Sequence, residues 1–147
     1  MKRIAISWLI ALLMGVAAQP ALADETVVLV VSADSKITSL DSLEVRKLFL
    51  GMTVIHDGKR VRPLVNEADP QLKEVFLQNI VSMTEVTYDR RVLRLALQQG
   101  LSIPVTYTDV TALLDEIAAD PTAVTFAWAR EVQHDKRIKV LRVLWHD

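Results

Sequence analysis

An unbroken apolar run near the start of the chain constrains the fold more than any other feature. Residues 26–31 read Thr-Val-Val-Leu-Val-Val, with no polar residue after the first. β-branched residues favour strands, and a strand that is apolar at every position is typical of one buried on both faces of a sheet. Helical patterns alternate with strand patterns along the rest of the chain. The sequence therefore predicts an α/β fold with a mixed sheet flanked by helices.

The helical segments carry recognisable end signals. Asp41 followed by Glu44 predicts a capping box, and Asp69-Pro70 predicts a helix start. Either Thr108 or Asp109 caps the last helix. Apolar residues at helical spacing follow these signals in four segments, which are 40–49, 72–83, 86–97 and 110–118. The third segment has apolar stripes on two faces, so we expect that helix to be buried from more than one side.

The other segments predict strands and turns. Asp57-Gly58 between apolar-bearing flanks has the chemistry of a tight hairpin turn. The expected strands after it are 61–65, 103–107, 123–128 and 138–144, with a charged connection at 130–137. No long linker divides the chain, so residues 24–147 are expected to form one domain.

The first residues have the three parts of a secretory signal peptide. Lys2-Arg3 precedes an apolar run, and the small residues Ala21 and Ala23 follow Pro20. We expect cleavage between Ala23 and Asp24, release into the periplasm, and no membrane span afterwards. A retained anchor is the alternative, but a spanning helix needs about 20 apolar residues and this run is shorter. With no Cys in the chain, a lipoprotein anchor is excluded.

Charge and motifs narrow the function classes. Removal of Lys2 and Arg3 takes the formal net charge from −1 to −3, which argues against nucleic acid or anionic lipid as partner. There is no phosphate-binding Gly loop and no Gly-x-Ser-x-Gly, and the three His residues are far apart. We therefore expect no metal, no cofactor and no enzymatic activity. A Ser–His–Asp site stays open by composition, although nothing marks any Ser as a nucleophile.

Four residues are candidates for contacts with an anion. Ser32, Ser35 and Thr38 offer hydroxyl groups just after the first buried strand. Ligands of open α/β sheets bind outside the carboxyl ends of the strands. Arg62 would be their charge partner, because a guanidinium is a planar fork that matches phosphate or carboxylate. In the alternative interpretation these residues are ordinary turn, cap and solvated surface residues.

One block of residues resembles a known family. Segment 37–51, Asp57-Gly58, Val61-Arg62-Pro63-Leu64 and Phe76 look like the short periplasmic substrate-binding-protein-like domains related to the phosphate-binding component of phosphate ABC transporters. Segment 113–126 is similar to that family's late helix, turn and strand. The resemblance implies a reduced type II periplasmic binding protein, without enzymatic activity, whose solute binding is linked to ABC transport.

The chain also departs from that family. Where the family has an Arg and a Ser-Gly-Thr that bind the anion, this chain has Asn66-Glu67-Ala68-Asp69-Pro70. The expected cleavage site leaves no room for the family's first anion-binding loop. Two hypotheses follow. The protein captures a small solute such as an anion, or it is a periplasmic accessory domain that has lost the pocket and binds a protein partner or a second copy of itself.

Overall fold

The structure is a computed structural model that describes residues 25–147. The predicted signal peptide, residues 1–23, and the cleavage site between Ala23 and Asp24 lie outside the described residues. The elements follow in the order β1 (Thr26–Ser32), α1 (Ser42–Phe49), β2 (Ile55–His56), β3 (Lys59–Arg60), β4 (Arg62–Asn66), α2 (Pro70–Phe76), the π-helical turn η1 (Leu77–Val81), α3 (Glu85–Gln99), β5 (Val105–Tyr107), α4 (Val110–Ala119), β6 (Ala123–Trp128), α5 (Ala129–Val132) and β7 (Ile138–His146).

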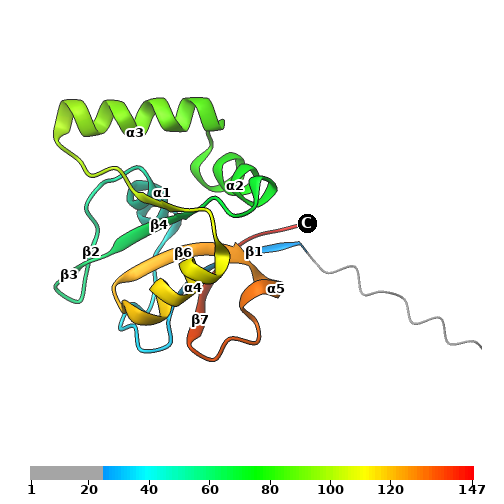
Figure 1. Ribbon diagram of the computed structural model, residues 1–147. Coiled ribbons are helices and arrows are strands. Elements are labelled where there is room, and N and C mark those ends of the chain that lie inside the picture. Colours follow the sequence, from blue (N-terminus) through cyan, green and yellow to red (C-terminus); the bar gives the residue numbers. More distant parts are fainter. Residues whose placement is uncertain (1–24) are drawn as a thin grey trace, which may run out of the picture.

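A five-stranded sheet in the order β5-β4-β6-β1-β7 forms the centre of the molecule (Figure 1). β4 pairs in parallel with β5 and β6, whereas β1 is antiparallel to both of its neighbours, β6 and β7. The predicted α/β class with a mixed sheet is therefore confirmed. β1 is the one strand of this sheet that runs against the other four.

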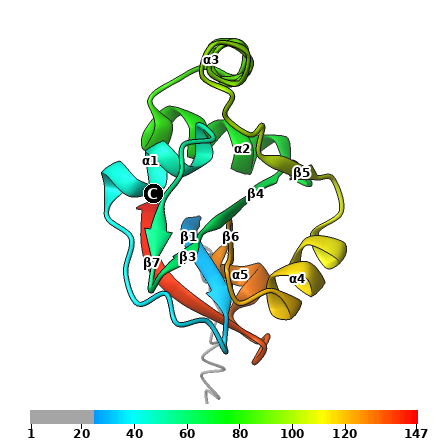
Figure 2. The same ribbon diagram turned by 90° about the vertical axis from the view of Figure 1, so that its left-hand side faces the viewer.

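Helices cover both faces of the sheet. Figure 2 shows α1 and α2 on one side and α4 and α5 on the other. Side chains alternate between the two layers along β1, since Val27, Leu29 and Val31 join the cluster under α1 and α2, and Val28 and Val30 join the cluster under α4. A strand with a helical layer on each side has no solvent-facing position, which explains its continuous apolar sequence.

Three phenylalanines tie the α1–α2 layer to the sheet. The rings of Phe76 on α2 and Phe126 on β6 are stacked, with centroids 3.8 Å apart. Phe49 on α1 meets Phe76 edge-on at 4.9 Å. Aromatic pairs of this kind contribute about 0.5–1.5 kcal/mol beyond the burial of their area. This cluster fixes how both helices lie on the sheet.

The turn and cap chemistry predicted from the sequence is confirmed. The amide of Glu44 donates to the Asp41 carboxylate, and the amide of Asp41 donates to the Glu44 carboxylate, both at 2.8 Å. Asp57 and Gly58 have φ of +52° and +71°, as a two-residue hairpin turn requires. Asp109, rather than Thr108, caps α4.

Other expectations need correction. The 72–83 segment is not one regular helix, because α2 gives way to η1 at Leu77. The charged 130–137 connection is partly helical, because the short helix α5 extends from Ala129 to Val132. The expectation that the 86–97 helix is buried from more than one side is wrong. Its second stripe, made of Val86, Leu93 and Leu97, lies in solvent.

Gly51 holds α1 against the segment before β5. Its φ is +88°, and a Cβ at this position would collide with the carbonyl oxygen of Ser102. Gly100 has a similar φ of +64°, but a Cβ there would meet nothing within 4 Å. The two glycines thus share a left-handed backbone and differ in the space around them.

Replacing these glycines by alanine should separate the two effects. Gly100→Ala carries the cost of the left-handed backbone alone, about 1–2 kcal/mol. Gly51→Ala adds a collision that costs about a further 1–3 kcal/mol. Urea unfolding of both variants measures the difference. Equal losses would mean that the Gly51–Ser102 approach does not constrain the fold.

Candidate functional site

The sheet geometry marks one place where a ligand is expected. The parallel strands β4, β5 and β6 end at Asn66, Tyr107 and Trp128. From β4 the chain crosses to β5 on one side, and β6 lies on the other side of β4. The place where the connections of neighbouring parallel strands run to opposite sides is called a switch point. In open α/β sheets, ligands bind in the crevice at this point. Here it lies between the loop after β4 and the loop after β6.

Asp69 occupies this crevice with its own carboxylate. Its Oδ1 accepts hydrogen bonds from the amides of Gln71 at 2.9 Å and Leu72 at 3.4 Å, in the first turn of α2. Its Oδ2 accepts a hydrogen bond of 2.8 Å from the indole nitrogen of Trp128 at the end of β6. Asp69 therefore both caps α2 and joins the two loops of the switch point.

The contacts of Asp69 stabilise its charged form. The hydrogen bond from Trp128 is the largest cause that lowers the pKa of Asp69, and the amides of Gln71 and Leu72 act in the same direction against the effect of burial. The guanidinium of Arg130 lies 4.9 Å from the centre of the Trp128 ring, as in a cation–π contact, and also lowers this pKa. The crevice thus holds an ionised carboxylate supplied by the chain itself.

The other polar groups after β4 are also engaged. The amide nitrogen of Asn66 donates to the carbonyl of Phe126 at 3.1 Å, and its Oδ1 accepts from the amide of Ala68 at 3.0 Å. Lys73 is buried, and its ammonium lies 2.6 Å from Glu67 and 2.9 Å from Glu85. Burial alone would lower the pKa of Lys73, but the two carboxylates outweigh it and raise that pKa.

Glu131 is the exception at this site. Its Oε2 is buried and has no hydrogen-bond partner among residues 25–147. Burial raises the pKa of Glu131, and the negative charge of Asp69 adds to that shift, while Arg130 opposes it. The switch point therefore carries more carboxylate than its donors satisfy. This excess of negative charge disfavours the binding of an anionic ligand.

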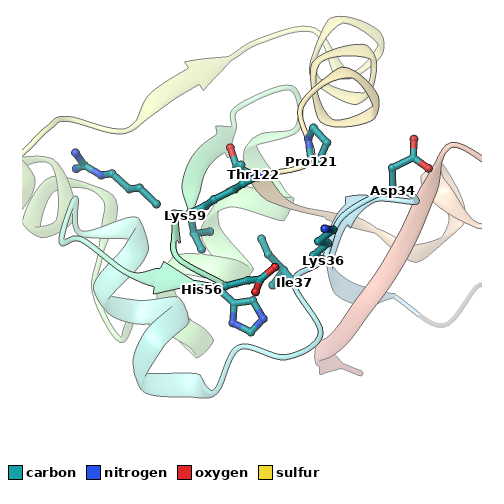
Figure 3. Close-up of a pocket in the computed structure, with 10 residues that line it drawn as sticks. Asp34, Lys36, Ile37, His56, Lys59, Pro121 and Thr122 are labelled. Carbon is teal, nitrogen blue, oxygen red and sulfur yellow. The ribbon is translucent and has the colours of Figure 1, made fainter.

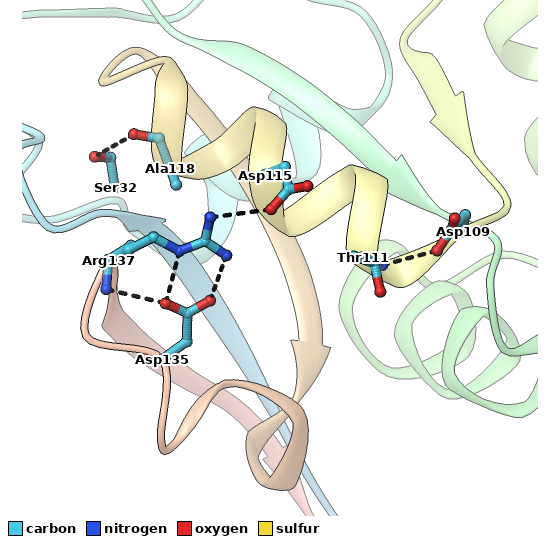
Figure 4. A network of polar contacts seen from close by, with 7 residues as sticks. All are labelled: Ser32, Asp109, Thr111, Asp115, Ala118, Asp135 and Arg137. Carbon is cyan, nitrogen blue, oxygen red and sulfur yellow. Dashed lines mark hydrogen bonds and ion pairs between the residues drawn. The ribbon is translucent and has the colours of Figure 1, made fainter.

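The anion contacts proposed from the sequence lie at the other end of the strands, opposite the switch point. Because β1 is antiparallel, its carboxyl end lies beside the amino ends of β4 and β6. Ser32 and Ser35 are buried there, and their hydroxyls donate to the carbonyls of Ala118 at 3.3 Å and Pro121 at 2.7 Å. Figure 4 shows Ser32 at the end of α4, which Arg137 also holds through Asp115.

Arg62 reaches the same region, whereas the hydrogen bond of Thr38 is to His56 in β2. The Arg62 guanidinium forms ion pairs with Glu116 and, at 2.9 Å, with Asp120. The structure thus brings Ser32, Ser35 and Arg62 together around the end of α4, where each has an internal partner. Thr38 is not part of these contacts, and its amide donates to Nε2 of His56 at 3.3 Å. Their role in ligand binding stays a prediction.

A groove runs along this edge. One part, with a volume of about 140 Å³, lies between the loop after β1, the β2–β3 hairpin and the turn before β6 (Figure 3). Lys36, His56, Lys59 and Arg60 line it together with Asp34 and Asp57. A wider part of about 410 Å³ continues past Arg62 to the segment before β5. Charges of both signs therefore face this groove.

The comparisons with solved structures show the fold. The chain matches an ABC-type phosphate transport receptor from Vibrio cholerae with a TM-score of 0.60 and 12% identity, over 82% of this chain and 46% of that chain. It matches a possible phosphate binding protein from Planctomyces limnophilus with a TM-score of 0.57 and 8% identity, over 82% and 42%. PstS from Borrelia burgdorferi matches with a TM-score of 0.53 and 11% identity, over 81% and 47%.

These matches define the class of fold. The chain is a domain with the fold of periplasmic binding proteins, related in architecture to phosphate-binding components of ABC transporters. It spans less than half the length of each of those proteins. No family model and no curated protein matches the sequence. The resemblance stated from the sequence is confirmed at the level of the fold.

Metal-binding clusters and membrane-spanning helices are both absent from the described part of the chain. Residues 25–147 contain no group of three or more His, Cys, Asp or Glu side chains placed to hold a metal ion. None of the helices in the same range is both long enough and apolar enough to cross a membrane.

Sequence reasoning missed two residues of the switch point. Trp128 is apolar enough to be assigned to a strand, and Glu131 lies in the connection assigned as a charged loop. Their meeting with Asp69 depends on the pairing of β6 with β4, which the sequence does not reveal. One signal of this site was present in the sequence. Segment 66–70 has carboxylates where the resembling family has the Arg and the Ser-Gly-Thr that bind an anion.

The indole of Trp128 can be tested through the titration of Asp69. Trp128→Phe removes the donor and should raise the pKa of Asp69 toward its ordinary value of 3.8, as measured by NMR of the carboxyl carbon. A depressed pKa stabilises the fold above that ordinary value, and the contribution disappears as the pH falls through the lower, folded value. The stability gap between wild type and variant should therefore narrow below about pH 4. Trp145→Phe, whose indole makes no hydrogen bond within residues 25–147, is the control; an unchanged Asp69 titration in Trp128→Phe would contradict the assignment.

Glu131→Gln should stabilise the protein at neutral pH. A carboxyl group with a raised pKa destabilises the fold above its ordinary value of 4.5, and the cost is absent below it. The variant should therefore unfold at a higher denaturant concentration than wild type at pH 7, and the gain should vanish near pH 4. Glu74→Gln, at an exposed position on α2, controls for the isosteric change. A gain that persists at low pH would show that burial of the charge is not the cause.

Proposed function

We propose that this protein is an exported, non-enzymatic accessory domain of the periplasm that has kept the scaffold of a solute-binding protein and works by contact with other proteins. The observation that carries the proposal is the carboxylate of Asp69 at the switch point. It accepts hydrogen bonds from the first turn of α2 and from Trp128, where an anionic ligand would need the same donors.

Electrostatics supports this interpretation. An anion at the switch point would meet Glu67, Asp69 and Glu131, against the two cations Lys73 and Arg130. Lys73 is already paired with two carboxylates, and Arg130 lies over the Trp128 ring. Like charges at close range raise the energy of the charged forms, so a dianion would be repelled or would force protonation of a carboxylate.

The periplasmic location rests on the first residues of the chain. Their charged start, apolar run and small-residue end are typical of a signal for secretion. The proteins of similar fold are described as phosphate transport or phosphate-binding proteins, which agrees with a scaffold that operates outside the cytoplasm. N-terminal sequencing of the protein recovered from a periplasmic extract tests this part, and a start at Asp24 is expected.

Isothermal titration tests the loss of the pocket. The exported protein, dialysed free of small anions, should give no saturable heat with inorganic phosphate, sulfate or molybdate at millimolar concentration. Asp69→Ser removes the internal carboxylate while keeping a helix cap, and should allow weak phosphate binding to appear. Saturable micromolar binding of phosphate to the wild type would overturn the accessory function.

Anion binding linked to ABC transport is the second candidate, and the groove at the other edge favours it. Lys36, Lys59 and Arg60 give that groove more cationic than anionic side chains. Ser32, Ser35, Thr38 and Arg62 are the candidate contacts for an anion, and of these Arg62 lines the wider part of the groove and would be the charge partner. Ser32 and Ser35 would have to give up their hydrogen bonds to the carbonyls of Ala118 and Pro121. Such binding requires Arg62 to exchange Glu116 and Asp120 for the ligand.

This second function makes its own prediction. If an anion binds beside Arg62, Arg62→Ala should abolish the calorimetric signal, whereas Arg90→Ala, on exposed α3, should leave it unchanged. Equal effects of the two substitutions would exclude the assignment. A stability measurement on Arg62→Ala is needed as well, because the same substitution also breaks the ion pairs with Glu116 and Asp120.

A further inference from the structure

Helix α3 presents an apolar stripe to solvent. Tyr88, Val92 and Leu95 hold its inner face to the protein and are 4–5% exposed. On the opposite side Val86, Leu93 and Leu97 are 66%, 51% and 78% exposed. In Figure 1 the helix lies at the periphery of the molecule, well away from the sheet. A helix fixed by one face with an apolar stripe on the other has an unpartnered surface.

The spacing of this stripe is that of a coiled-coil seam. Val86, Arg90, Leu93 and Leu97 follow one another at intervals of four, three and four residues. These intervals correspond to alternating d and a positions of a heptad, with Arg90 as one polar residue among apolar ones. We call these four residues the outer stripe. The inner-face residues fall at the c and f positions, so packing on the protein leaves the seam open.

The charges beside the outer stripe determine which orientation a partner helix can take. Asp89 falls at a g position on one side, and Arg94 falls at an e position on the other. Both are exposed and make no ion pair within residues 25–147. In a parallel pair the g position of one helix faces the e position of the other, so Asp89 meets Arg94 twice across a two-fold axis. In an antiparallel pair like flanks meet, and equal charges oppose each other.

We propose that a second copy of this chain docks on the outer stripe, with the two α3 helices parallel and joined by reciprocal Asp89–Arg94 ion pairs. The proposal rests on the proposed function as a protein-interaction domain and names its partner. An acidic helix from another protein fits less well, because it would meet Arg94 on one flank but Asp89 on the other. A second copy satisfies both flanks at once.

The dimer is of the weak, reversible class. α3 has 15 residues, which gives a seam about 22 Å long at 1.5 Å per residue. That length holds only two heptads, and Arg90 in the seam lowers the stability of the pair. The helix itself does not have to fold on association, since its inner face is already packed. We therefore expect dissociation in the micromolar range, within reach of sedimentation equilibrium.

Charge reversal tests the ion pairs. Asp89→Arg and Arg94→Asp should each weaken self-association at least tenfold in sedimentation equilibrium, because each places like charges across the axis. An equimolar mixture of the two variants should associate as heterodimers, since positions 89 and 94 then carry opposite charges at both contacts across the axis. The double variant should return to wild-type behaviour. Both positions are exposed, so the variants should fold, as circular dichroism will verify.

Cysteine cross-linking tests the orientation. The chain has no Cys, so a single introduced thiol can only join two copies. Leu93→Cys, at a d position, should form a disulfide dimer on mild oxidation, because the same position meets itself across a parallel pair. Gln98→Cys, on the same helix but away from the seam, should form no disulfide cross-link under the same conditions.

Several results would overturn the proposal. A wild-type protein that is monomeric at several hundred micromolar has no such dimer. Association that survives both charge reversals, or equal cross-linking at positions 93 and 98, would place the contact elsewhere. A complex formed only with another protein would mean that the stripe serves that partner instead. None of these outcomes bears on the calorimetry with phosphate, so the accessory function and the dimer can fail independently.

Discussion

The pairing of β1 with β6 and β7 is the constraint on which the rest of the structure depends. β1 lies between β6 and β7 in the sheet, and its side chains point alternately into the two helical layers. Because it runs against its neighbours, its own end falls at the edge opposite the ends of the parallel strands. The direction of this strand therefore places the loop after it at the groove beside Arg62, away from the switch point beside Asp69.

At the switch point the chain supplies its own negative charge. The donors at the start of α2 and the indole after β6 form a place suited to negative charge. A carboxylate carried by the chain takes that place at no cost in translational entropy, unlike a diffusing ligand. The remaining polar groups there are paired, apart from Glu131. The hydrogen bonds of Asp69 to the start of α2 and to Trp128 join the loops after β4 and β6.

Local signals in the sequence were sufficient for most elements and insufficient for the site. The capping box at Asp41, the Asp57-Gly58 turn and the buried strands depend on neighbouring residues, and all were predictable. The antiparallel direction of β1 depends on long-range pairing, so the sequence could not reveal that Ser32 and Ser35 lie opposite the ends of the parallel strands. The second apolar stripe of α3 led to a wrong prediction of burial. The spacing of apolar residues identifies an apolar helix face, but it does not reveal whether another element covers that face.

The position of β1 in both sequence and sheet has a consequence for how the chain acquires its shape. Within the described residues, this first strand pairs only with the last two, β6 and β7. Its valines therefore have no ladder to join until nearly the whole chain is present, and such non-local closure slows folding. In a chain that crosses a membrane from its amino end, this apolar strand would emerge early. Its partner strands β6 and β7 would emerge last. Assembly of the sheet is then a late, cooperative step, during which protection from aggregation matters most.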